Sequence, residues 1–252
     1  MSNNQSPQIL GTAPIGKLLV EYSLPAIIAM TVVSLYNVID SIFIGHGVGA
    51  MAIAGLAITF PLMNLIIAFC TLVGVGAATI SSIYMGQKDI QRATFVLHNA
   101  AILLLVNGLL VTIVTLIFLD PILLFFGASH ETLPYARDFM QVILIANPIA
   151  YLFVGLNNLM RATGYPKKAM LSSFLTVAVN VIVAPIFIFV LDWGIRGAAM
   201  ATAIAQLTGL VWVLAHFLNK KSFISFKKGC FKLHRRIIAS ILSIGMSPFL
   251  MN

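Results

Sequence analysis

Residues 36–47 read YNVIDSIFIGHG, an apolar run that is interrupted by a single carboxylic acid, Asp40. The run lies in a chain of 252 residues, of which 60% are hydrophobic and only 9% are charged. The mean hydropathy is +1.02. A water-soluble globule with this composition would not have enough polar groups to cover its surface. The sequence therefore predicts an all-α integral membrane protein.

Apolar segments long enough to cross a bilayer recur along the chain. About 20 apolar residues span the hydrocarbon core as a helix, and six complete segments meet this length. The six segments are 17–44, 51–84, 93–119, 139–160, 169–191 and 197–218, and a seventh begins near Ile237. We therefore expect a six-transmembrane-helix bundle followed by the start of a seventh helix.

The basic residues sort by side of the membrane. The net charge of +8 would suggest nucleic acid in a soluble protein, but here the positions of the charges argue against such a partner. If the N-terminus is cytoplasmic, thirteen of the fifteen Lys and Arg residues fall inside, and Arg137 and Arg196 are left outside. This asymmetry predicts a multi-pass protein with a cytoplasmic N-terminus.

A basic segment divides the chain into three parts. Residues 219–236, NKKSFISFKKGCFKLHRR, are interpreted as a solvated cytoplasmic linker that lies on anionic headgroups. Beyond it, SILSIGMSPFL can be laid on KLLVEYSLPAI of the first span, so that Pro248 falls on Pro25. We expect a six-helix lobe at 1–218, the linker at 219–236, and the truncated start of a second lobe at 237–252. The natural protein would then be nearly twice as long.

Asp40 is the leading candidate for chemistry. An ionised carboxylate within a membrane costs a few kcal/mol or more, so such an acid is a functional-site hypothesis by default. Tyr36 and Asn37 lie four and three residues before it, on the same helical face, and could hydrogen-bond the carboxyl group while it exchanges a proton or a cation. Pro25 lies on the same helix and is a candidate hinge. The alternative is an interfacial Asp40, wetted by headgroups because Gly45 ends the span.

Two polar residues on other spans lie at a comparable depth. A rise of about 1.5 Å per residue places Asn180 and Thr202 in the same half of the membrane as Asp40, so one shared pocket is geometrically possible. Other intramembrane amides either line a cavity or join helices, and joining is favoured for each. These amides are Asn64, Asn107, Gln141, Asn147, Asn157, Asn158 and Gln206. The histidines have no ligand spacing, so we expect neither a metal site nor another cofactor.

The landmarks of the chain resemble a known family. Residues 36–62 (YNVIDSIFIGHGVGAMAIAGLAITFPL), 159–170 (LMRATGYPKKAM), 179–206 (VNVIVAPIFIFVLDWGIRGAAMATAIAQ) and 244–250 (IGMSPFL) look like successive parts of the N-terminal lobe of multidrug and toxic compound extrusion (MATE) transporters. The resemblance implies two six-helix lobes and alternating access in a bacterial inner membrane. It also implies export of cationic amphiphilic compounds, driven by protons or sodium ions.

The resemblance also assigns residues. The family's carboxylate on the first span falls on Asp40, its fifth-span asparagine on Asn180 and its sixth-span threonine on Thr202, and Pro25 matches a proline at which some members bend. Where many members have a second acid on the fifth span, this chain has Ala184. Asp40 would then carry the coupling ion alone or with the other lobe, and the choice between proton and sodium stays open.

Three other functions are weighed against this one. A flippase for lipid-linked saccharides, from the same superfamily, would need several cations in its cavity to hold a diphosphate, and no Lys or Arg lies clearly deep in a span. An intramembrane enzyme would need a second acid or a nucleophile with a base, so we expect no enzyme. The third is a non-transporting membrane bundle or accessory half.

Overall fold

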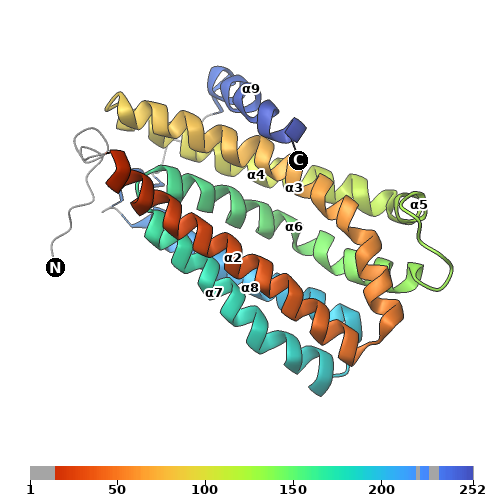
Figure 1. Ribbon diagram of the computed structural model, residues 1–252. Coiled ribbons are helices and arrows are strands. Elements are labelled where there is room, and N and C mark those ends of the chain that lie inside the picture. Colours follow the sequence, from red (N-terminus) through yellow and green to blue (C-terminus); the bar gives the residue numbers. More distant parts are fainter. Residues whose placement is uncertain (1–14, 220–221, 227–232, 252) are drawn as a thin grey trace.

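The computed structural model describes residues 15–219, 222–226 and 233–251 (Figure 1). In the first helix, the side chains at positions 15, 17, 18, 21, 22, 25, 26, 29, 33 and 37 are outside the described part. The described elements are α2 (Ile15–Gly47), α3 (Ala50–Gly86), α4 (Ile90–Ile117), α5 (Leu119–Phe125), α6 (Leu133–Ala162), α7 (Pro166–Pro185), the π-helix η1 (Ile186–Val190), α8 (Gly194–Leu218) and α9 (Arg235–Met251).

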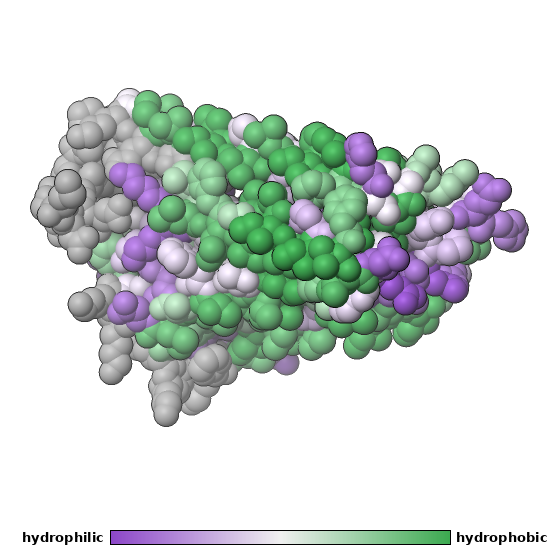
Figure 2. All heavy atoms as spheres, turned by 90° about the horizontal axis from the view of Figure 1, so that it is seen from below, coloured by the Kyte–Doolittle hydropathy of each residue, from purple (hydrophilic) through white to green (hydrophobic). Residues whose placement is uncertain are grey.

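The fold is an all-helical membrane bundle, as predicted. Among the described residues, five helices are long and apolar enough to cross a membrane: α3, α4, α6, α7 extended by η1, and α8. Helix α2 supplies a further 33 residues at the position predicted for the first span. Hydrophobic residues cover most of the face in Figure 2, and hydrophilic residues gather toward its ends. This distribution is typical of a multi-pass membrane protein.

Helix α6 lies in the middle of the bundle, in contact with α3, α4, α7 and α8 (Figure 1). Small residues allow close approach to α3, because a Cβ added at Gly74 would lie 3.0 Å from the Cα of Gly155. Nearby, the Ser82 hydroxyl donates to the carbonyl of Ala162 at 3.2 Å. Short side chains and interhelical hydrogen bonds are what hold helices together in a membrane.

Two of the intramembrane amides join α4 to its neighbours, as favoured from the sequence. Asn107 donates to the carbonyl of Phe69 on α3 at 2.7 Å, and Asn147 on α6 donates to Thr112 Oγ1 on α4 at 3.2 Å. By contrast, Asn64 and Gln141 are exposed. The bonded amides satisfy carbonyl and hydroxyl groups that lipid could not hydrogen-bond.

The seventh helix packs on the outside of the bundle. Helix α9 crosses α3 at two glycines, Gly245 and Gly76. A Cβ at Gly245 would collide with the carbonyl oxygen of Leu72, and one at Gly76 with that of Ile241. The two backbones therefore touch directly at the crossing. The division of the chain into lobes at 218 and 237 stays a prediction.

Part of the segment interpreted as a solvated linker is packed against the bundle, which corrects that interpretation. Ile224 and Ser225 are buried, and the Phe226 N–H donates to the carbonyl of Phe217 at 2.9 Å. The Ser222 hydroxyl donates to the carbonyl of His216 at 2.8 Å. The segment thus satisfies carbonyl groups that the end of α8 leaves without helical partners. Positions 227–232 lie outside the described residues.

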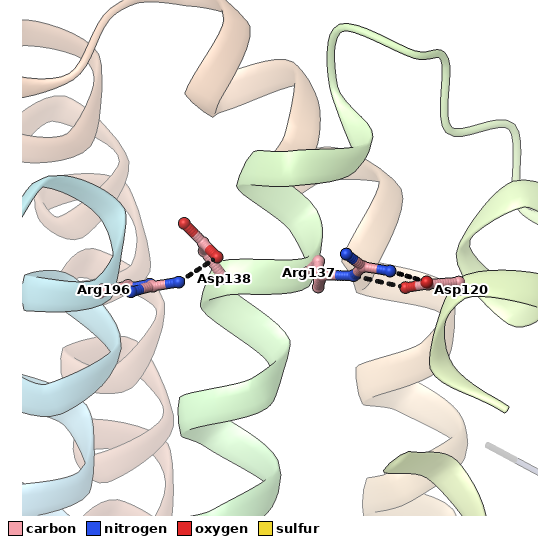
Figure 3. Close-up of polar contacts among 4 residues, drawn as sticks. All are labelled: Asp120, Arg137, Asp138 and Arg196. Atoms are coloured by element: carbon pink, nitrogen blue, oxygen red, sulfur yellow. Dashed lines mark hydrogen bonds and ion pairs between the residues drawn. The ribbon is translucent and has the colours of Figure 1, made fainter. Parts of the chain in front are cut away.

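The two arginines predicted to lie on the outer side of the membrane, Arg137 and Arg196, form ion pairs at one end of the bundle (Figure 3). Arg137 on α6 pairs with Asp120 on α5, and its Nε donates to Asp120 Oδ1 at 2.7 Å. Arg196 on α8 lies 2.7 Å from Asp138 on α6. These pairs tie α5 and α8 to the first turns of α6 and neutralise both cations. Which side of the membrane this end faces stays a prediction.

Candidate functional site

Asp40 lies in the wall of a large cavity. The residue is 8% exposed, and α2 continues beyond it to Gly47; whether Asp40 lies at the membrane interface stays open. The cavity has a volume of about 770 Å³. The Oδ1 atom has no hydrogen-bond partner among the described residues. We call this space the Asp40 cavity. Its lining residues are Tyr36, Val38, Asp40, Ser41, Ile42, Gly45, His46, Ala50, Ile53, Leu56, Phe60, Met63, Phe139, Ile143 and Thr202.

Three predicted residues from three helices form one hydrogen-bonded group, which we call the Tyr36 cluster. The hydroxyl groups of Tyr36 on α2 and Thr202 on α8 lie 3.0 Å apart. The amide of Asn180 on α7 donates to the Thr202 hydroxyl at 3.1 Å and to the Tyr36 hydroxyl at 3.3 Å. Thr202 also donates to the carbonyl of Ala198, at 3.2 Å. The cluster therefore joins the helix that carries Asp40 to α7 and α8.

The Tyr36 cluster lies between the Asp40 cavity and a second, smaller one. Tyr36 and Thr202 line both cavities, whereas Asp40 lines only the first and Asn180 only the second. The second cavity has a volume of about 260 Å³, and we call it the Arg161 cavity. Asp40 and Asn180 thus line different cavities, although the depth argument had allowed a single pocket for Asp40, Asn180 and Thr202.

Four helices line the Arg161 cavity, and three of them do so with faces that follow helical spacing. Residues of α7 recur at steps of three and four along one face, and residues of α6 and α8 do the same. The lining residues are Tyr36, Phe153, Val154, Asn157, Asn158, Arg161, Ser173, Thr176, Val177, Asn180, Thr202, Ala205 and Gln206. From the sequence, Asn157, Asn158 and Gln206 were candidates to line a cavity, whereas Arg161 was counted among the cations on the cytoplasmic side. The spacing of Asn157, Asn158 and Arg161 over one turn was the signal that could have placed it.

Several predictions about the site stay predictions. The backbones of Pro25 and Asn37 lie in α2, but their side chains are outside the described part. Ala184 is fully buried one turn after Asn180, and Asp40 is the only carboxylate among the residues that line the two described cavities. Among the described residues, no group of three His, Cys, Asp or Glu side chains could hold a metal ion.

Comparison with known proteins finds one family throughout. The family model described as MatE matches residues 25–186. The multidrug export protein MepA of Staphylococcus aureus (strain NCTC 8325 / PS 47) is 30% identical over 240 residues, which cover 95% of this chain and 53% of that protein. The chain therefore spans about half the length of the curated relatives it matches.

Solved structures agree with the sequence match. An outward-facing multidrug resistance MATE family transporter of the MOP superfamily aligns with a TM-score of 0.90 at 29% identity, over 99% of this chain and 55% of that one. An inward-facing structure of such a transporter aligns with a TM-score of 0.80 at 28% identity, over 86% of this chain and 49% of that one. The likeness thus extends over one half of each transporter.

Proposed function

Because this chain belongs to the MATE family of membrane transporters, we propose that it forms the N-terminal lobe of a secondary active exporter. The exporter drives cationic amphiphilic compounds out of the cell in exchange for protons or sodium ions. A second lobe of the same protein is the proposed partner, and a bacterial inner membrane with the N-terminus in the cytoplasm is the proposed location.

The observation that carries this proposal is the buried carboxylate of Asp40. One of its oxygens has no described hydrogen-bond partner, and a buried charge without a partner is unfavourable. Binding a proton or a cation removes that penalty. The group therefore has a strong physical reason to exchange positive partners, which is what an ion-coupled transporter requires of its coupling site.

The walls of the Asp40 cavity suit an amphiphilic cation. Apart from Asp40 and His46, the described lining contains no Asp, Glu, Lys, Arg or His, and Phe60 and Phe139 supply aromatic surface. A cavity of about 770 Å³ lies within the range that holds drug-sized molecules. A hydrophobic molecule with one positive charge would bury its apolar part against this wall and place its charge near the carboxylate.

The Tyr36 cluster offers a link between ion binding and helix movement. Tyr36 lies one helical turn before Asp40, and its hydroxyl is hydrogen-bonded to α7 and α8. A change in the charge of Asp40 alters the free energy of the conformation in which these bonds form. A ligand shifts an equilibrium between two conformations only if it binds one of them more tightly than the other. We propose that α2 moves relative to α7 and α8 when Asp40 gains or loses its positive partner, with Pro25 as the hinge.

The test uses the protein that carries this lobe together with a second lobe, reconstituted in liposomes with a fluorescent cationic dye. We expect an imposed pH or sodium gradient to drive dye efflux, and Asp40→Asn to reduce that efflux to the background, because an amide neither takes up a proton nor neutralises a cation. The gradient that works identifies the coupling ion.

The matched control is Asp192→Asn, the same chemical change at an exposed carboxylate. Asp192 has φ 53°, a backbone conformation that asparagine tolerates, so this variant should transport as the parent does. Efflux that survives Asp40→Asn at the parent rate would refute the proposal.

A lipid-linked saccharide flippase fits the Asp40 cavity less well. Holding a diphosphate calls for several cations, and the described lining of that cavity contains no Lys or Arg. In the same liposomes, a flippase would move a lipid-linked diphosphate across the bilayer and leave the dye in place. A non-transporting bundle would move neither.

A further inference from the structure

The Arg161 cavity contains a cation without a counter-charge among the described residues. Three other arginines, Arg92, Arg137 and Arg196, each pair with an aspartate, although their side chains are 45–65% exposed. Arg161 is more deeply placed, yet it forms no ion pair with any described carboxylate. Among the described residues, its hydrogen bond is a long one, in which Nη2 donates to Asn157 Oδ1 at 3.4 Å. A guanidinium group that is partly withdrawn from water favours a nearby anion.

The lining around Arg161 presents free donors and no acid. Neither Asn158 nor Gln206 forms a hydrogen bond with the described residues, so their amide groups are available. The hydroxyl of Ser173 already donates to Ala169 and that of Thr176 to Ser173, at 3.2 and 2.7 Å. The groups left to meet a ligand are therefore a guanidinium, which donates in a fixed fork, and two amides.

Helix-end electrostatics explain only part of this arrangement. Arg161 lies in the last turn of α6, where a cation interacts favourably with the helix dipole. That effect requires no cavity, whereas Arg161 lines one of about 260 Å³. The volume is large enough for a small polyatomic ion and several waters.

We propose that the Arg161 cavity is a binding site for an oxyanion, a carboxylate or phosphate group held by Arg161 with help from Asn158 and Gln206. Such groups match the guanidinium fork and form charge-assisted hydrogen bonds with it. The site goes beyond the proposed exchange of cations at Asp40, because it selects the opposite charge on the far side of the Tyr36 cluster. Its ligand is either a soluble oxyanion or the phosphate of a lipid headgroup.

The test labels a cysteine placed in each cavity of the 252-residue chain in nanodiscs, with Cys230 replaced by serine. Ser173→Cys reports on the Arg161 cavity, and Ser41→Cys on the Asp40 cavity. Each variant is treated with thiol-specific methanethiosulfonates that carry either a sulfonate or a trimethylammonium group. Relative to a free thiol, we expect the anionic reagent to be favoured roughly tenfold at position 173 and the cationic reagent at position 41, because fixed charge in a cleft concentrates counter-ions.

Charge variants assign the preference to Arg161. Arg161→Gln should remove the preference at position 173, Arg161→Lys should keep it, and Arg92→Gln, at an exposed arginine, should leave it unchanged. A variant that fails to fold is recognised by its elution from a sizing column. If Arg161→Gln does not fold, Arg161→Lys, which keeps the positive charge, shows whether the preference depends on charge or on the structure of the arginine. An unchanged preference in folded Arg161→Gln would overturn the proposal, as would equal rates of the two reagents in the parent.

Protection experiments identify the source of the oxyanion. Inorganic phosphate or acetate that slows labelling at position 173 in phosphatidylcholine nanodiscs indicates a soluble ligand. Slower labelling only when phosphatidylglycerol is added indicates a headgroup. Either form of protection should disappear in Arg161→Gln. Protection that is equal in the parent and in that variant, or absent with all three probes, contradicts an oxyanion site.

Discussion

The two cavities of this lobe share a boundary and differ in almost everything else. The Asp40 cavity is about three times the size of the Arg161 cavity, and its wall is mostly apolar with a single acid. More than half of the residues that line the Arg161 cavity are polar, and one of them is a base. Both touch Tyr36 and Thr202. The difference teaches that a cluster of polar residues inside a membrane bundle can separate two environments rather than form one site.

The largest expected effect comes from placing a second acid beside this boundary. Ala184 is fully buried and lies outside the described lining of both cavities, so Ala184→Asp buries a carboxylate without a cavity to hydrate it. We expect a loss of about 3 kcal/mol in the free energy of unfolding, measured by equilibrium denaturation in detergent micelles. Ala184→Asn, which adds a similar volume without charge, should cost less. Equal losses would show that volume rather than charge decides.

Two adjacent amides on α6 allow an amide that joins two helices to be compared with one that forms no hydrogen bond with the described residues. Asn157 is buried and donates to the carbonyl of Ala169 at 3.1 Å and to the hydroxyl of Ser172, whereas Asn158 bonds to no described residue. We expect Asn157→Ala to lower the free energy of unfolding by about 2 kcal/mol and Asn158→Ala by less than about 0.5 kcal/mol. The same denaturation assay compares the two. A larger loss for position 158 would mean that its amide is engaged after all.

The boundary itself should yield a smaller effect than Ala184→Asp or Asn157→Ala, a coupling between two hydroxyl groups. Tyr36→Phe and Thr202→Val each remove one side of the 3.0 Å contact. A double-mutant cycle should show that the two losses are non-additive by about 1 kcal/mol, because removal of the first hydroxyl already breaks their shared bond. Strictly additive losses would show that each hydroxyl bonds only to Asn180 or to its own helix.

The helices could be predicted from the sequence because their cause is local. Length and hydropathy identify each span wherever it packs, and the predicted first span, 17–44, lies within α2. The π-helix after Pro185 was not predicted. Beyond the proline, the Leu191 N–H donates to the carbonyl of Ile186, five residues before it, at 2.9 Å, which is the bond of a π-helix. Whether a proline kinks a helix or opens a wider turn depends on packing that no spacing rule contains.

The site was predictable along each helix but not between helices. Tyr36 and Asp40 were expected to share a face, and both line the Asp40 cavity. Which cavity Asn180 would line depends on how α7 is rotated against α6 and α8, and this is set by many contacts at once. The prediction of a solvated linker was wrong for part of residues 219–236 for a related reason. Phenylalanine and isoleucine among lysines are typical of a headgroup-bound loop, yet Ile224 is buried against the bundle.

The crossing of α3 and α9 has a mechanical consequence. Where Gly76 and Gly245 meet, backbone touches backbone, and nearby the rings of Phe69 on α3 and Phe249 on α9 lie with their centroids 5.0 Å apart. We therefore expect a bulky residue at either glycine to push α3 and α9 apart, because even a Cβ at these positions would collide with the backbone of the other helix.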